Sequence, residues 1–215
     1  MKKLIVLGAG GHCQSVVDSI SPDIYSDIVA IDLPQNVGKR INGILIQGHD
    51  DQIEDFFNAG YTDAFITLGT IGNTDRRRFL YSELLRIGFN IPNIIDPSAI
   101  VSKNIEMLGK GIFIGKGAIV NAGVTIGNCC IVNTKASIDH GSKLGDFVNV
   151  SPGSCISGDA TIGNDTHIGT GSSIIQGIQI GDNSMIGAGS VVVKNIPSNV
   201  VAYGCPCKVH REKKS

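Results

Sequence analysis

The chain has 215 residues, enough for two modest domains, with 18 basic and 19 acidic side chains and a formal net charge of −1. A charge so close to zero gives no electrostatic reason for nucleic acid or an anionic membrane to be the main partner. No stretch approaches the roughly 20 apolar residues of a membrane span, and the apolar run after Lys2 and Lys3 is too short for a signal peptide core.

The six cysteines are Cys13, Cys129, Cys130, Cys155, Cys205 and Cys207, and no two of them form a C-x-x-C pair. Such spacing disfavours both a disulfide scaffold and a zinc cluster. We therefore expect reduced thiols that serve as small hydrophobic side chains, as in a cytoplasmic protein.

Residues 1–92 are predicted to form a small α/β domain. Strands are expected at residues 4–7, 27–31 and 64–68, and helices at residues 13–20, 51–59 and 74–87. Because strands and helices alternate, we expect a Rossmann-like parallel sheet with ligands bound beyond the carboxyl ends of its strands. Pro92, Asp96 and Pro97 indicate a linker, after which residues 93–215 form a second domain.

The turn Gly8-Ala9-Gly10-Gly11-His12 between the first strand and helix is similar to a dinucleotide fingerprint, with Asp32 near the place of a ribose-binding carboxylate. The third glycine is replaced by Cys13, which keeps the helix too far from the sheet for that fingerprint and disfavours an NAD-type cofactor. The helix N-terminus still suits one end of a nucleotide diphosphate. Asn73 and Arg76 could contact the same ligand, or could be a helix cap and part of a solvated basic face.

An aliphatic residue recurs at every sixth position of the second domain. The fifteen positions are Leu108, Ile114, Val120, Ile126, Val132, Ile138, Leu144, Val150, Ile156, Ile162, Ile168, Ile174, Ile180, Ile186 and Val192. This period fits neither a helix nor an isolated strand, but it is typical of a parallel β-helix in which three hexapeptides make one coil. The repeat predicts five coils, about 24 Å of stack at about 4.8 Å per strand spacing. We expect an imperfect start at residues 100–107 and an end after Val193.

His140 is the candidate general base, because a near-neutral imidazole on a rigid coil can take a proton from an attacking nucleophile. An ordinary exposed turn histidine is the alternative interpretation. Because three hexapeptides make one coil, Gly158 should stack on His140 and Asp159 on Gly141. The Gly158 N–H could then face a developing oxyanion, and either Asp159 or Asp139 could orient the imidazole.

The second histidine of the repeat, His167, directly precedes Ile168 in an outward-facing position. It lies one and a half coils along the chain from His140. A zinc site like that of the gamma-type carbonic anhydrases needs three converging imidazoles, and these two cannot meet within one chain. The sequence therefore predicts no metal site.

The order of α/β domain, Pro-containing linker, hexapeptide repeat and Gly-x-Pro-x-Lys tail resembles the bacterial nucleotide-sugar N-acetyltransferases of the bacillosamine and perosamine type. Sialic acid O-acetyltransferase-like proteins are close relatives of that family. The resemblance covers almost the whole chain. Its most specific motifs are Gly8-Ala9-Gly10-Gly11-His12, Gly69-Thr70-Ile71-Gly72-Asn73-x-x-Arg76, Asn133-Thr134 followed by Asp139-His140, and Gly204-Cys205-Pro206-Cys207-Lys208.

The resemblance implies a left-handed β-helix and a homotrimer with active sites between neighbouring subunits. It implies transfer of an acetyl group from acetyl-CoA to the amine of a UDP-, dTDP- or GDP-linked 4-amino-4,6-dideoxy sugar, for surface glycans. His140 would be the general base beside Asp139, Asn133 would line the site, and the Gly158 N–H would bind the thioester oxygen. The nucleotide sugar would contact Gly10, Gly11, His12, Asp32, Gly69 and Asn73. Coenzyme A would contact Asn149, Gly158, Gly187, Ala188 and Lys208.

Some residues depart from the family pattern. Gly141 stands where an acid often follows the catalytic histidine, so the sequence does not identify what orients His140. Asn149 replaces a second histidine and can donate a hydrogen bond but cannot carry a proton. Leu33 replaces the second acid of an Asp-Asp pair. The Cys205-Pro206-Cys207 tail replaces a common Val-Pro-Ala, a change among small side chains.

Two other functions remain open at this point. The acceptor could be a sugar hydroxyl, as in sialic acid O-acetylation, although a hydroxyl is a poorer nucleophile and would suffer more from an absent carboxylate at Gly141. The β-helix could also be a non-enzymatic ligand-binding protein. Incubation with acetyl-CoA and panels of amino and hydroxy sugars separates these functions.

Overall fold

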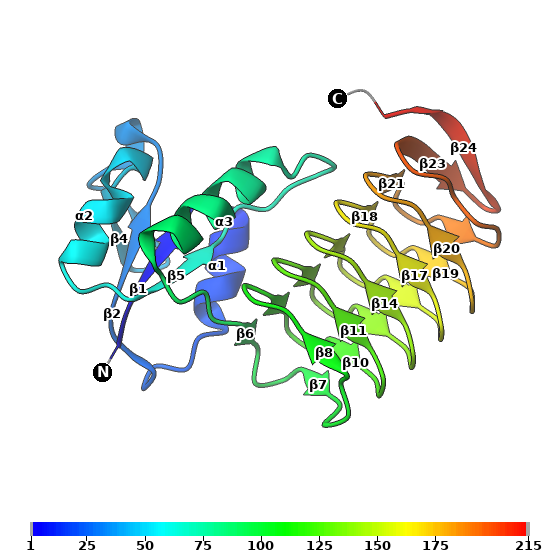
Figure 1. The fold of residues 1–215 in the computed structure, drawn as a ribbon, viewed down its shortest axis with the longest axis horizontal. Helices are drawn as coiled ribbons and strands as arrows, with labels where there is room; N and C mark the ends of the chain where they lie inside the picture. The colour runs from blue at the N-terminus through cyan, green and yellow to red at the C-terminus, as the bar shows by residue number, and fades with distance from the viewer. Residues whose placement is uncertain (1, 214–215) are drawn as a thin grey trace. The chain divides into compact units, whose positions relative to one another are not determined.

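The computed structural model describes residues 2–213, without the side chains of Met107 and Leu108. The chain forms two compact units (Figure 1). The first contains the residues up to Thr70 together with Asp75–Ile94, and the second contains Ile71–Thr74 together with the chain from Ile95 onward. No helix within residues 2–213 is long and apolar enough to cross a membrane.

The first unit is an α/β domain around one five-stranded sheet, with strand order β3-β4-β2-β1-β5. Its strands are β1 (Lys2–Leu7), β2 (Tyr25–Ile31), β3 (Arg40–Ile41), β4 (Ile44–Gly48) and β5 (Asp63–Ile66). Its helices are α1 (Gly11–Asp18), α2 (Ile53–Asn58) and α3 (Asp75–Ile87), with 3-10 turns at Pro34–Asn36 and Asp50–Gln52. The expected parallel sheet is confirmed for β1, β2, β4 and β5, and only β3 pairs antiparallel.

The β3–β4 hairpin was not expected from the sequence. Its turn is Asn42-Gly43, where both residues have positive φ angles of 47° and 82°. An Asn-Gly pair between short apolar segments is the usual signal for such a two-residue hairpin, so this element was detectable. Inside the sheet, Leu4–Leu7 are all fully buried, as expected for a central strand covered on both faces.

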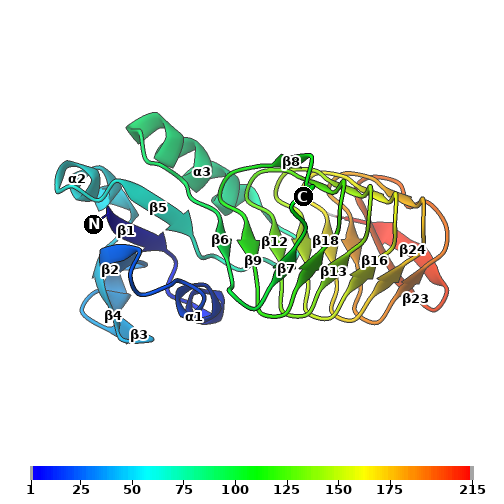
Figure 2. The same cartoon turned by 90° about the horizontal axis from the view of Figure 1, so that it is seen from below.

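The second unit is a parallel β-helix with three faces, and Figure 2 shows its coils stacked one on another. Its strands up to Val192 have two residues each, and the two that follow are longer. The first face contains β6 (Ile94–Ile95), β9 (Phe113–Ile114), β12 (Ile131–Val132), β15 (Asn149–Val150), β18 (His167–Ile168), β21 (Met185–Ile186), β23 (Val200–Gly204) and β24 (Cys207–Glu212). The second face contains β7 (Ile100–Val101), β10 (Ile119–Val120), β13 (Ser137–Ile138), β16 (Cys155–Ile156), β19 (Ser173–Ile174) and β22 (Val191–Val192). The third face contains β8 (Met107–Leu108), β11 (Thr125–Ile126), β14 (Lys143–Leu144), β17 (Thr161–Ile162) and β20 (Gln179–Ile180).

The hexapeptide anchors fill the interior of this β-helix. The anchors from Ile114 to Val192 are all buried, with at most 3% of their surface exposed. The first anchor, Leu108, has a side chain that lies outside the described residues. Strand partners such as Ile131 with Asn149 and Ser137 with Cys155 are three hexapeptides apart in the sequence, which confirms the predicted coil length.

The first coil begins earlier than the sequence predicts. β6 already pairs within the first face, and Asp96, which the sequence placed in a linker, is only 3% exposed. Its Oδ1 accepts hydrogen bonds from the Ser98 N–H at 2.9 Å and the Ser98 hydroxyl at 2.6 Å, and its Oδ2 lies 3.2 Å from Lys116 Nζ. Asp96 is therefore a structural residue of the first coil, since its buried charge is paired and hydrogen-bonded.

The last coil is shorter than the others. In the pairing of β21 with β23, Ile186 lies beside Ala202, whereas three full hexapeptides would bring it beside Gly204. Ala202 is fully buried and takes an interior position. On the third face, Ile196 forms only an isolated bridge with Ile180. The six-residue pattern ends after Val193 as predicted, but the coil itself continues to β23 and closes with the β23–β24 hairpin.

Candidate active site

His140 lies on the corner of the coil that joins β13 of the second face to β14 of the third face. Its side chain is exposed, and the ring makes no hydrogen bond to any residue between 2 and 213. The backbone beneath it is fixed, because the His140 N–H donates to Asp139 Oδ1 at 2.8 Å and the His140 carbonyl accepts from the Asp159 N–H at 2.8 Å. The corner thus presents an accessible imidazole on rigid backbone.

Gly158 supports the ring of His140 from the next coil. A Cβ atom added to Gly158 would lie 2.6 Å from His140 Nε2 and 2.9 Å from Nδ1, so the imidazole covers this α-carbon and fills the space that a side chain would take. The predicted stacking of Gly158 on His140 is therefore confirmed. Within the described part of the chain, the Gly158 N–H donates to no protein acceptor, so it can bind an oxygen of a ligand.

The two candidate carboxylates do not bind the imidazole. Asp139 Oδ1 accepts from the backbone N–H of His140 and, at 2.9 Å, from the amide of Asn121; these two donors hold the pKa of Asp139 below its usual range. Asp159 stacks on Gly141 as predicted, because a Cβ on Gly141 would collide with its carboxylate. In the described residues, Asp159 accepts from Gln176 Nε2 at 3.4 Å rather than from His140. The ring lies against Gly158 instead of a carboxylate.

Asn133 and Asn149 lie away from His140 within one chain. Asn133 follows β12 on the corner between the first and second faces, and its Oδ1 accepts the Thr134 N–H at 2.8 Å. Asn149 belongs to the first face, between Ile131 and His167, and is 8% exposed. Within one chain, Asn133 therefore lies on a different corner of the coil from His140, and Asn149 lies on a face.

Gly187, Ala188 and Lys208 gather at the C-terminal end of the β-helix. A Cβ on Gly187 would lie 2.7 Å from Tyr203 Cβ, and Lys208 pairs with Tyr203 across the β23–β24 hairpin. The Tyr203 ring stacks on His210 with centroids 3.6 Å apart and an interplanar angle of 5°. The spacing of Tyr203 and His210 in the sequence does not predict this aromatic pair, because the contact depends on the bulge of the hairpin.

His167 faces outward from the coil as predicted, but it is only 8% exposed. Its Nε2 lies 3.4 Å from Ser151 Oγ. Burial lowers the pKa of His167, and the positive charge of Lys213 lowers it further. Among the described residues, no group of three or more His, Cys, Asp and Glu side chains could hold a metal ion.

The Gly-rich turn of the α/β domain leaves open space at the start of α1. Gly10 caps this helix and Gly11 begins it, and a Cβ on either glycine would meet no atom within 4 Å. Packing within the chain therefore does not require glycine at either position. Asp32 holds the turn in place, because its Oδ2 accepts from the Ala9 N–H at 3.0 Å and its Oδ1 from the Leu33 N–H at 2.7 Å.

His12 and Gly69 lie next to each other in the same domain. A Cβ on Gly69 would be 3.2 Å from His12 Cβ. Burial lowers the pKa of His12 to about 4, with a further contribution from the charge of Arg77, so this ring is neutral at pH 7. Asn73 belongs to the segment Ile71–Thr74, which groups with the β-helix.

A cavity of about 340 Å³ lies in the α/β domain at the carboxyl ends of β1 and β2. Its lining residues are Gly8, Ile31, Asp32, Leu33, Asp50, Leu68, Arg76 and Leu80. Arg76 forms an ion pair with Asp50, and its guanidinium lies 5.1 Å from the centre of the Phe79 ring. Of the residues that the sequence suggested for the nucleotide, Asp32 and Arg76 line this cavity.

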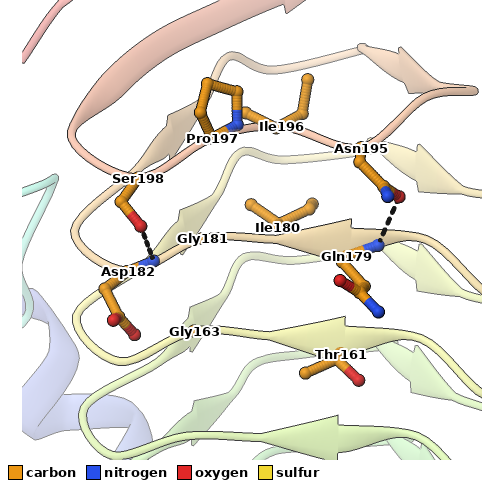
Figure 3. Close-up of a pocket in the computed structure, with 10 residues that line it drawn as sticks. All are labelled: Thr161, Gly163, Gln179, Ile180, Gly181, Asp182, Asn195, Ile196, Pro197 and Ser198. Atoms are coloured by element: carbon orange, nitrogen blue, oxygen red, sulfur yellow. Dashed lines mark hydrogen bonds between the residues drawn. The ribbon is translucent and has the colours of Figure 1, made fainter.

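A second cavity, of about 550 Å³, lies on the third face where the last coil is shortened (Figure 3). There Asn195 Oδ1 accepts the Gln179 N–H at 2.9 Å, and Ser198 Oγ accepts the Asp182 N–H at 3.0 Å. Asn195 thus replaces a backbone carbonyl, because one coil earlier the Thr161 N–H donates to the Ile178 carbonyl. Ser198 replaces a side-chain acceptor, because one coil earlier the Asn164 N–H donates to Asp182 Oδ1. The cavity contains none of the expected site residues, and we assign its shape to the shortened coil.

Comparison with known proteins adds evidence of ancestry. Residues 3–84 match the family described as "PglD N-terminal domain", and residues 159–194 match the family described as "Bacterial transferase hexapeptide (six repeats)". The chain is similar to the acetyltransferase domain of PglB from Neisseria gonorrhoeae, with 33% identity and a TM-score of 0.90 over 98% of this chain and 100% of that one.

A second similar structure is a histidine-to-asparagine variant of perosamine N-acetyltransferase from Caulobacter crescentus, in complex with CoA and GDP-perosamine. Identity to this enzyme is 28%, and the TM-score is 0.91 over 99% of this chain and 98% of that one. The PglB domain has also been solved with acetyl coenzyme A, and that structure matches with a TM-score of 0.88. The similarity extends over both units of the chain.

Proposed function

Because the chain belongs to the bacterial nucleotide-sugar N-acetyltransferases of the hexapeptide-repeat superfamily, we propose that it transfers an acetyl group from acetyl-CoA to a sugar amine. The acceptor is a UDP-, dTDP- or GDP-linked 4-amino-4,6-dideoxy sugar. The observation that carries this proposal is the exposed His140 ring held on Gly158, whose N–H is free to bind an oxygen. A rigid base beside a free donor is the arrangement that direct acyl transfer requires.

The chemistry needs no covalent enzyme intermediate. The amine nitrogen forms a bond to the thioester carbon, His140 takes a proton from that nitrogen, and the Gly158 N–H stabilises the negative oxygen. When the C–S bond breaks, the sulfur of CoA leaves as a thiolate and can receive the proton from His140. In this mechanism Asp139 holds the backbone of His140 rather than its ring, because its Oδ1 accepts the His140 N–H.

The test is a thiol-release assay with acetyl-CoA and a panel of UDP-, dTDP- and GDP-linked 4-amino-4,6-dideoxy sugars, with mass spectrometry of the product. We expect CoA release and an acetylated amine with at least one of these sugars. Release with sialic acid or another hydroxy sugar, and with none of the amines, would instead establish an O-acetyltransferase. A cytoplasmic location, which the cysteine spacing predicts, stays a prediction.

We further propose that the active protein is a homotrimer with each active site between two chains. In support, Asn133 and Asn149 do not lie on the same corner as His140 in one chain, so a neighbouring chain is needed to bring them to it. Coenzyme A would then lie along the β-helix from Gly158 towards Gly187, Ala188 and Lys208. The nucleotide would lie in the α/β domain at Gly10, Gly11, His12, Asp32 and Gly69. Asn73, whose segment groups with the β-helix, is a ligand residue only by the resemblance.

Subunit mixing tests the shared site. His140→Ala and Asn149→Ala variants are each purified, then denatured and refolded together. If each site takes His140 from one chain and Asn149 from another, the mixture contains some intact sites and recovers part of the wild-type rate. A mixture no faster than the separate variants, in a trimer verified by light scattering, would show that the two residues act from the same chain.

A further inference from the structure

We propose that the Arg76–Asp50 ion pair binds the uncharged nucleoside part of the nucleotide-linked acceptor sugar, and that Arg76 is not a phosphate ligand. The proposal rests on the proposed function, because it identifies how the nucleotide-linked sugar is held in the α/β domain. The site is the cavity of about 340 Å³ at the carboxyl ends of β1 and β2.

The size and lining of this cavity suit a nucleoside. Pockets for small molecules usually measure about 300–1,000 Å³ and are mainly apolar with a few polar groups. This one is near the lower limit, which leaves room for a base and ribose but not for a complete nucleotide sugar. Five of its eight lining residues have no polar side chain, namely Gly8, Ile31, Leu33, Leu68 and Leu80. Such walls suit the faces of a flat base.

The charges of the cavity exclude a diphosphate from it. The lining contains two carboxylates, Asp32 and Asp50, and one guanidinium, Arg76. The sum is −1, so a diphosphate would be repelled on entry. A neutral nucleoside is not repelled. The diphosphate fits better at the start of α1, where Gly10 and Gly11 leave open space and the helix dipole favours an anion.

Arg76 is already paired with a carboxylate. Its guanidinium binds Asp50 and lies over the Phe79 ring. To bind a phosphate, it would have to leave Asp50 uncompensated in a partly enclosed site. As a pair, however, the two side chains offer donors and acceptors side by side, which match the alternating polar atoms on the edge of a nucleobase.

Asp32 has a different part in the same cavity. Both of its carboxylate oxygens already accept backbone N–H groups, from Ala9 and Leu33. A carboxylate has further lone pairs and can still accept a ribose hydroxyl, but its first effect is to fix the turn. Arg76 and Asp50 are therefore the charged side chains of this cavity that are available to the base.

Calorimetric titration of a charge series tests the proposal. The probes are uridine, thymidine and guanosine, each compared with its monophosphate and diphosphate, on wild type, Asp50→Asn and Arg76→Met. For the base that binds, we expect each variant to have an affinity about 10- to 100-fold lower than wild type, as for a lost hydrogen bond to a charged group. This factor should be the same for the nucleoside, its monophosphate and its diphosphate. The pair is half exposed, with 51% and 34% of its side-chain surfaces accessible, so the variants should fold.

Gly11→Ala is the matched control, since its Cβ meets no protein atom. If the diphosphate lies at the start of α1, the loss of affinity in this variant grows with each phosphate. The decisive result is whether Asp50→Asn weakens or strengthens binding of the diphosphate. Tighter binding of the diphosphate in that variant, or a loss in Arg76→Met that grows with phosphate number, would make Arg76 a phosphate ligand and overturn the proposal. Unchanged affinity in both variants would overturn it as well. If wild type binds none of the probes, the proposed function itself fails.

Discussion

The β-helix and the α/β domain bring their candidate residues together in different ways. In the β-helix the chain returns to the same corner after three hexapeptides, so His140 meets Gly158 through the repeat itself. In the α/β domain, Asp32 meets Ala9, and Arg76 meets Asp50, through a sheet and helices whose spacing in sequence is irregular. A regular repeat makes three-dimensional neighbours predictable by counting, whereas an irregular fold requires the structure.

The largest expected effect tests what the β-helix contributes to chemistry. His140→Ala should lower kcat by about 10²- to 10⁴-fold, as for a lost general base. Because the side chain is exposed and its ring binds no residue in the described range, the melting temperature should stay within about 2 °C of wild type. The rate is measured by thiol release at saturating acetyl-CoA, and added imidazole should restore part of it. Near-normal turnover would remove His140 from the mechanism.

The next prediction concerns the anchors of the repeat. Ile162→Ala should lower the free energy of unfolding by about 2–5 kcal/mol, because it leaves a cavity in a packed interior, where Ile162 is 1% exposed. Its neighbour Thr161 is an outward-facing, exposed residue of the same strand, and Thr161→Ala should change this free energy by less than about 0.5 kcal/mol. Urea unfolding followed by circular dichroism compares the two. Equal losses would mean that the six-residue period does not define the core.

A third prediction concerns the α/β domain, where burial changes the pKa of His12. The folded pKa of His12 is about 4, below the value of about 6.5 expected when unfolded. The unfolded state therefore binds more protons as the pH falls from about 6.5 towards 4, and stability is lost in this window. From pH 7 to pH 5, His12 should account for about 2 kcal/mol of lost stability in wild type, and His12→Gln should lose that much less.

Urea unfolding at both pH values, followed at 222 nm, measures this loss, since the described helices all belong to the α/β domain. The ring of His12 can also be titrated directly by NMR. If wild type and His12→Gln lose the same free energy of unfolding between pH 7 and pH 5, the pKa of His12 does not differ between the folded and unfolded states. The prediction then fails.

Much of the fold follows from local rules in the sequence. The anchors from Ile114 to Val192 predicted the interior of the β-helix, and alternating strands and helices predicted the parallel sheet. The sequence missed the short last coil, because Ala202 takes the interior position beside Ile186 where counting in hexapeptides leads to Gly204. It also placed Asp96 in a linker, because an Asp-Pro pair usually indicates a turn, whereas the ion pair with Lys116 that allows burial depends on the folded coil.

The candidate site was predictable to the extent that it depends on the coil. Counting placed Gly158 on His140 and Asp159 on Gly141, but it could not show that neither carboxylate binds the imidazole, because that depends on side-chain rotamers. The Arg76–Asp50 pair joins two distant positions of an irregular domain. The sequence suggested Arg76 as a possible ligand residue, but nothing in the spacing indicates that Asp50 is its partner.

The smallest expected effect separates two glycines of the same β-helix. Gly158→Ala places a Cβ 2.6 Å from His140 Nε2, but the obstacle is an exposed ring that can move aside. We expect kcat to fall about tenfold, less than the roughly 10²-fold cost of a 1 Å misplacement, while the melting temperature stays unchanged. Gly163→Ala instead places its Cβ 2.5 Å from the backbone nitrogen of Asp182. Because backbone cannot move aside, this variant should melt earlier. If Gly158→Ala also melted earlier, Gly158 would be a packing residue of the coil rather than the support of the catalytic ring.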